Sequence, residues 1–83
     1  MRTEQEIRNR IREMETAMRD AITNYYKKEW KEEFFAKIYS TIWDNMRELH
    51  WALGMTQTEA SNLVARKVMR MSDEIRALIE NQQ

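Results

Sequence analysis

Apolar residues recur at helical spacing in three stretches of the chain. Within each stretch, successive apolar residues are three or four positions apart. This spacing places their side chains on one stripe of a helix, which faces a neighbouring helix. The three series are Ile7, Ile11, Met14, Met18, Ala21 and Tyr25; Phe35, Ile38, Ile42, Met46, Leu49 and Leu53; and Ala60, Val64, Val68, Met71, Ile75 and Leu78. The pattern predicts three amphipathic helices, at about residues 4–27, 32–53 and 57–80.

Capping residues mark the boundary between the second and third predicted helices. Gly54 is the only glycine and directly follows the second apolar series, where a left-handed C-terminal cap is common. Thr56 and Glu59 have the T-x-x-E spacing of a capping box, as do Thr3 and Glu6 at the start of the first helix. We therefore expect the third helix to begin within a few residues of the end of the second.

The sequence allows two interpretations of the boundary between the first and second helices. The heptad positions between Tyr25 and Phe35 fall on Lys28 and Glu32, which are charged, and no glycine or proline marks a turn there. In one interpretation a turn near residues 27–33 folds the second helix back on the first. In the other, a single long helix runs over residues 4–53. We favour the turn, because an isolated helix gains most of its stability from a packing partner.

Composition limits the chemistry. The chain has 83 residues, which suits one domain over residues 1–83, and it lacks cysteine. Its single histidine, His50, has no second ligand at metal-binding spacing, and one glycine cannot build a phosphate-binding loop. We predict an all-α small helical bundle, an antiparallel hairpin plus a third helix. We expect no enzymatic activity, cofactor, metal or small-molecule substrate.

Charge is balanced throughout the chain. Lys and Arg together number 14, as do Asp and Glu, and the balance holds in each third of the sequence. A nucleic-acid-binding protein usually concentrates basic residues in a stripe, so nucleic acid is a disfavoured partner. Glu15 and Arg19 have the spacing of an ion pair on a solvated helix face. A net charge of zero eases association, and we expect a homodimer.

Targeting signals are not evident. No uncharged stretch is long enough to cross a membrane, and the first residues, Met1 to Glu4, lead into mixed charges rather than a signal peptide. The expectation is a cytoplasmic protein without a membrane partner.

The two ends of the predicted hairpin resemble a known group of proteins. The opening Met1-Arg2-Thr3-Glu4-Gln5-Glu6-Ile7 and the later Trp51-Ala52-Leu53-Gly54 are similar to the M-R-T-E-x-E-I start and W-x-L-G helix end of small helical-hairpin proteins from archaea, bacteria and their viruses. The resemblance covers residues 1–54 and implies a hairpin and a mobile-element origin, but no activity. This chain departs from the group in its aromatic middle, its turn without glycine and its third helix.

Aromatic residues are concentrated in one segment. Seven lie between residues 25 and 43, and on a helix they occupy two faces, which one partner helix cannot cover. In one interpretation the second face packs against the third helix. In the other it is an exposed binding patch, because Trp and Tyr are enriched in interface hot spots. The candidate partner-binding residues are Tyr26, Trp30, Phe34 and Trp43. The favoured function is a protein-interaction module, plausible for a small phage or mobile-element protein that inhibits or modulates a host protein.

A local basic cluster supports the main alternative. Arg66, Lys67 and Arg70 lie close together on the third helix and would contact phosphates if the chain were a small DNA-binding regulator. Asp73 and Glu74 follow one turn later and neutralise the cluster, which favours a solvated face. A structural assembly subunit is a further alternative.

Overall fold

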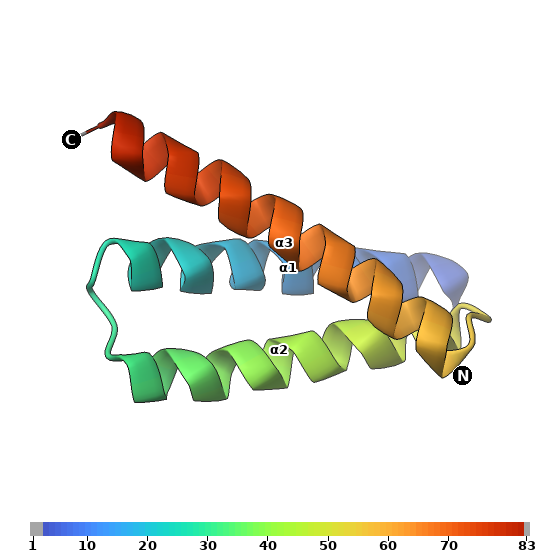
Figure 1. Ribbon diagram of the computed structural model, residues 1–83. Helices are drawn as coiled ribbons and strands as arrows, with labels where there is room; N and C mark the ends of the chain where they lie inside the picture. Colours follow the sequence, from blue (N-terminus) through green and yellow to red (C-terminus); the bar gives the residue numbers. More distant parts are fainter. Residues whose placement is uncertain (1–2, 83) are drawn as a thin grey trace.

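The computed structural model describes residues 3–82 and contains three helices. They are α1 (Glu4–Tyr26), α2 (Glu32–Ala52) and α3 (Gln57–Asn81) (Figure 1). The prediction of an all-α bundle, a hairpin plus a third helix, is confirmed, and the break after Tyr26 excludes a single helix over residues 4–53. Met1 and Arg2, which open the motif of the resemblance, lie outside the described residues.

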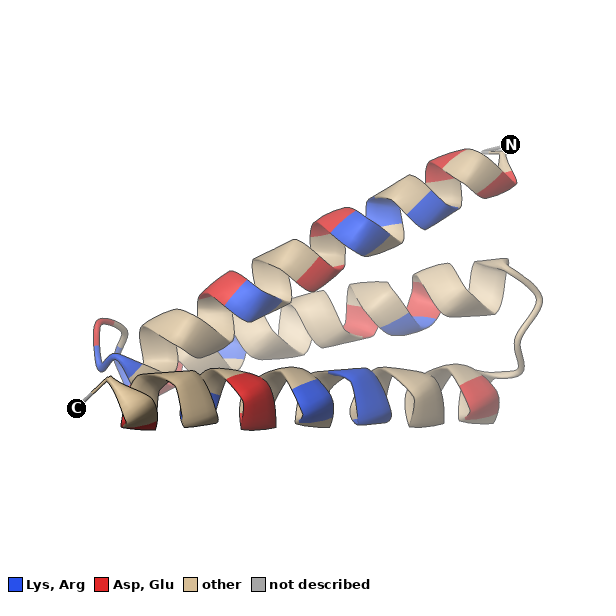
Figure 2. Ribbon diagram, turned by 90° about the horizontal axis from the view of Figure 1, so that it is seen from above, with Lys and Arg blue, Asp and Glu red and all other residues tan. Residues whose placement is uncertain are grey.

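The three helices form a rod of about 45 × 22 × 22 Å. α1 and α2 run antiparallel, and α3 crosses them at an angle (Figure 1). α3 begins beside the end of α2, and its C-terminal half moves away from α2. Seen from above, α1 and α3 spread apart toward the end where α1 begins (Figure 2). α3 therefore separates from α2 at one end of the bundle and from α1 at the other end.

The turn after α1 is a Schellman motif without glycine. The amide of Glu29 donates to the carbonyl of Asn24 at 2.9 Å, and the amide of Lys28 donates to the carbonyl of Tyr25 at 3.0 Å. This pair of bonds requires a left-handed residue at the position of Lys28, where φ is 62°. Such a position usually holds glycine. Lys28 adopts this conformation, so no glycine marks the turn in the sequence.

Replacing Lys28 by glycine is expected to raise the free energy of unfolding by about 1 kcal/mol, because the left-handed conformation strains a residue with a Cβ.

Gly54→Ala is the opposite case, because it adds a Cβ at a left-handed position. Gly54 has φ of 103°, and an added Cβ would meet no atom within 4 Å, so only backbone strain opposes the alanine. That variant should lose about 1–3 kcal/mol. Urea denaturation of both variants measures the two effects, and a loss of stability in Lys28→Gly would contradict the assignment.

The capping predictions hold to different degrees. Thr56 and Glu59 form a complete capping box, with the Thr56 hydroxyl accepting from the Glu59 amide and the Glu59 carboxylate accepting from the Thr56 amide. The hydrogen bonds from Thr56 lower the pKa of Glu59. At the start of α1, the Thr3 hydroxyl accepts from the Glu6 amide at 3.2 Å. Both helices therefore begin where the sequence predicts.

The core lies along the stripe where the three helices meet. Its largest fully buried side chains are Met18, Met46 and Val64, one from each helix. Leu78, the last predicted core position on α3, is 62% exposed, and Ile79 packs against the core instead. A strict seven-residue spacing follows the core only in a supercoiled helix, whereas the core-facing stripe of a straighter helix drifts away from it.

Candidate protein-interaction surface

Aromatic side chains gather at the end of the bundle where α1 turns into α2. Tyr25 stacks on Phe35 with ring centroids 4.3 Å apart, and Phe35 lies 5.5 Å from Tyr39. Phe35 and Tyr39 pack against the core, and burial raises the pKa of Tyr39. These three rings link α1 to α2, so they serve packing within the hairpin.

Three of the four candidate partner-binding residues are half-buried, namely Tyr26, Trp30 and Trp43. The Tyr26 hydroxyl lies 2.7 Å from the Ser72 hydroxyl, which connects the end of α1 to α3. Trp43 packs against the core, and the Arg47 guanidinium lies over its ring at 5.9 Å from the centroid. The rings of Tyr26 and Trp43 therefore have partners within the chain, as the interpretation of internal packing expects.

The candidates Trp30 and Phe34 meet at the surface. Phe34 is 50% exposed at the start of α2, and Trp30 lies in the turn that precedes it. Their rings meet edge to face, with centroids 4.9 Å apart and an interplanar angle of 84°. One side of Trp30 packs against the core, which fixes the pair in place. We call Trp30 and Phe34 the turn surface.

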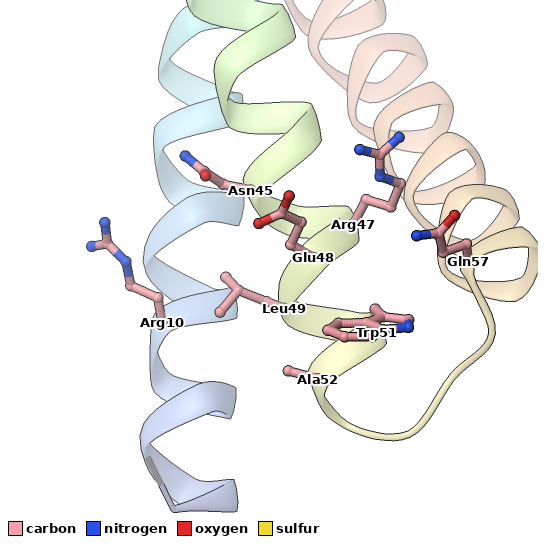
Figure 3. A pocket seen from close by; sticks show the side chains of 8 residues that line it. All are labelled: Arg10, Asn45, Arg47, Glu48, Leu49, Trp51, Ala52 and Gln57. Carbon is pink, nitrogen blue, oxygen red and sulfur yellow. The ribbon is translucent and has the colours of Figure 1, made fainter. Parts of the chain in front are cut away.

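A second exposed aromatic lies at the opposite end of α2. Trp51 is 56% exposed and lines a shallow hollow of about 470 Å³. Figure 3 shows its indole on the side of α2 that faces Gln57, whereas Leu49 lies on the side of Arg10. Trp51 is not among the four candidate partner-binding residues. Its place outside the predicted apolar stripe was the signal that it would be exposed.

The basic cluster on α3 does not form one surface. Arg66 and Arg70 are exposed and form no ion pair with another residue in 3–82. Lys67 turns instead toward α1, where its ammonium lies 3.0 Å from the Glu15 carboxylate. Glu15 therefore does not pair with Arg19, whose guanidinium lies 3.4 Å from Glu74. Basic and acidic residues are interspersed along the helices, and neither sign is gathered on one of them (Figure 2).

His50 is a buried polar residue that the apolar pattern did not reveal. It is 5% exposed, and its Nε2 atom lies 3.3 Å from the Lys67 ammonium. Because an ammonium can only donate, Nε2 accepts, and neutral His50 carries its proton on Nδ1. Nδ1 is buried and has no hydrogen-bond partner in the described part of the chain. Burial lowers the pKa of His50, and the nearby Lys67 charge lowers it further.

Acid is therefore expected to destabilise the fold through His50. The unfolded chain takes up a proton near pH 6.5, whereas the folded chain resists it until a lower pH. The contribution of neutral His50 to the free energy of unfolding is fully present above pH 6.5, and it decreases as the pH falls below that value. The charged groups that face His50 are Lys67 on α3 and Glu15, Arg8 and Arg12 on α1.

Urea denaturation at pH 7.5 and about pH 5.8 measures this effect. His50 is the only histidine, so the variant His50→Gln should show a much smaller loss between the two values. An equal loss in both proteins would contradict the assignment to His50.

A search for metal-ligand clusters and membrane-spanning helices in residues 3–82, and for proteins similar to the chain, found none. Residues 3–82 contain no group of three or more His, Cys, Asp or Glu residues that could hold a metal ion. No helix among them is both long and apolar enough to cross a membrane. Comparisons with protein-family models, curated proteins and solved structures found no match for this chain. The resemblance to small hairpin proteins therefore stays a prediction, and the function is argued from the residues themselves.

Proposed function

We propose that the chain is a non-enzymatic protein-interaction module that binds a protein partner through the turn surface. The observation that carries the proposal is the half-exposed ring of Phe34 held edge-on by Trp30. Large aromatic side chains dominate the binding energy of interfaces when they enter a pocket of the partner. Tyr26 and Trp43 are half-buried against the core and are not part of the proposed contact.

Position and rigidity support this use of the turn surface. Trp30 and Phe34 lie at one end of a narrow rod, where a concave partner can approach without contacting the helix flanks. The Schellman hydrogen bonds of Lys28 and Glu29 hold the segment that carries Trp30. A preformed surface loses little conformational freedom on binding, which favours affinity.

The proposed mode of action is occlusion. The two rings would fill a pocket on a host protein and exclude its normal ligand, which inhibits or modulates that protein. The proposal includes a phage or mobile-element origin, which rests on the sequence resemblance, and action in the host cytoplasm.

Photo-crosslinking tests the proposal. A benzophenone amino acid replaces Phe34 in one protein and Trp51 in a control, because Trp51 is 56% exposed at the opposite end of α2. The expected result is one foreign protein crosslinked at position 34 and not at position 51. Equal crosslinking at both positions, or none at position 34, would overturn the proposal.

Self-association is the second use that this surface could have, since the net charge is zero. A crosslink at position 34 to a second copy, with a dimeric mass by light scattering, would replace the foreign partner with a homodimer.

A further inference from the structure

A cleft of about 400 Å³ lies between the N-terminal halves of α1 and α3. It occupies the end of the bundle where these two helices spread apart in Figure 2, and the end of α2 forms its floor. Its apolar lining comes from α1, α3 and the loop between α2 and α3, namely Ile11, Leu53, Met55 and Leu63. This volume is in the range of sites that bind small molecules.

The charged lining of the cleft is predominantly basic. Arg8, Arg12 and Lys67 line it, against a single carboxylate, Glu15. Arg8 lies 2.8 Å from Glu4, and Lys67 lies 3.0 Å from Glu15. Arg12 forms no ion pair with any residue from 3 to 82. The chain as a whole is neutral, so this excess of positive charge is local.

The floor of the cleft is polar and firmly held. His50 is 5% exposed there and accepts a hydrogen bond from Lys67, which also contacts Glu15. Lys67 is therefore fixed by two partners from different helices and keeps one further N–H for a ligand. A positioned ammonium and an unpaired guanidinium that line the same cleft suit a carboxylate.

We propose that this cleft binds a small organic carboxylate with an apolar tail. The carboxylate lies between Arg12 and Lys67, and the tail covers Leu53, Met55 and Leu63. A cation is repelled by the three basic side chains, and a fully polar anion leaves the apolar wall uncovered. This site is separate from the turn surface, since Trp30 and Phe34 do not line it, and the inference does not depend on the proposed function.

Titration of the protein with sodium octanoate, measured by isothermal titration calorimetry, tests the site. We expect saturable binding at one site, with acetate and octylammonium at least about tenfold weaker because each lacks one half of the recognition. Arg12→Gln should weaken octanoate by about tenfold. Arg70→Gln is the matched control, because Arg70 is an exposed arginine that does not line the cleft, and it should bind octanoate like the parent protein.

A second readout locates the ligand. A carboxylate bound beside Lys67 favours the protonated form of His50, so NMR titration should show the pKa of His50 rising when octanoate is added. The proposal is overturned if octanoate shows no saturable binding up to about 10 mM. It is also overturned if octylammonium binds equally well, if Arg12→Gln binds like the parent, or if the pKa of His50 does not rise.

Discussion

Replacing Met46 by alanine is expected to lower the free energy of unfolding by about 2–5 kcal/mol. Met46 has no exposed surface and lies on α2 in the core cluster that α1 and α3 also supply. The substitution removes the contacts of a long side chain and leaves a cavity that three packed helices can close only in part. Since small domains are stabilised by about 5–15 kcal/mol in total, this loss is a large share of it. Urea denaturation followed by circular dichroism measures it.

Met69→Ala is the matched control. It is the same substitution on α3, but Met69 is 66% exposed, so we expect a change within about 0.5 kcal/mol. Equal losses in the two variants would show that Met46 does not lie in the core.

The double substitution Trp30→Ala with Phe34→Ala is expected to weaken binding of the crosslinked partner by at least about thirtyfold. The reason is that the two rings form one edge-to-face unit, and truncation removes both the ring that enters the partner and the ring that holds it in place. Titration of the purified partner by calorimetry gives the affinities of the parent and the variant.

Two further variants separate binding from folding. Met69→Ala with Leu78→Ala removes exposed apolar side chains elsewhere and should bind like the parent protein. Trp30 also contacts the core, so Phe34→Ala alone provides a variant whose core is intact. If that single variant binds at full strength while keeping its helicity, Phe34 is not an anchor.

The helices could be predicted from sequence because their pattern is local. Steps of three and four residues predicted α1, α2 and α3, and Gly54 with Thr56 and Glu59 predicted the second boundary. The left-handed conformation expected at Gly54 is confirmed. Such signals depend only on residues a few positions apart, which a sequence displays directly.

The remaining features depend on the paths of the helices in space. A lysine at the left-handed position of the first turn carries no sequence signal. The sequence therefore could not decide between a turn at Lys28 and one continuous helix. The exposed Leu78 and the packed Ile79 follow from the angle at which α3 leaves α2. The spacing of apolar residues along the chain does not determine the angle between two helices.

The candidate surface shows the same limit. The sequence grouped Tyr26, Trp30, Phe34 and Trp43, but the tertiary contacts place Tyr26, Trp30 and Trp43 against the core and leave Phe34 half-exposed. Lys67 likewise looked like a neighbour of Arg66 and Arg70 until α1 brought Glu15 within 3.0 Å of it. Pairings between distant residues decide which side chains are free to bind a partner.

The three tryptophans allow one measurement to test the turn surface as the binding site. Trp30 lies in the turn, Trp43 packs along α2, and Trp51 lies at the far end, so their indole N–H signals in a ¹⁵N NMR spectrum report on three places. When the crosslinked partner is added, the Trp30 signal should shift or broaden, and the signals of Trp43 and Trp51 should stay in place. A shift of the Trp51 signal with an unchanged Trp30 signal would contradict the account and place the interface at the hollow beside Gln57.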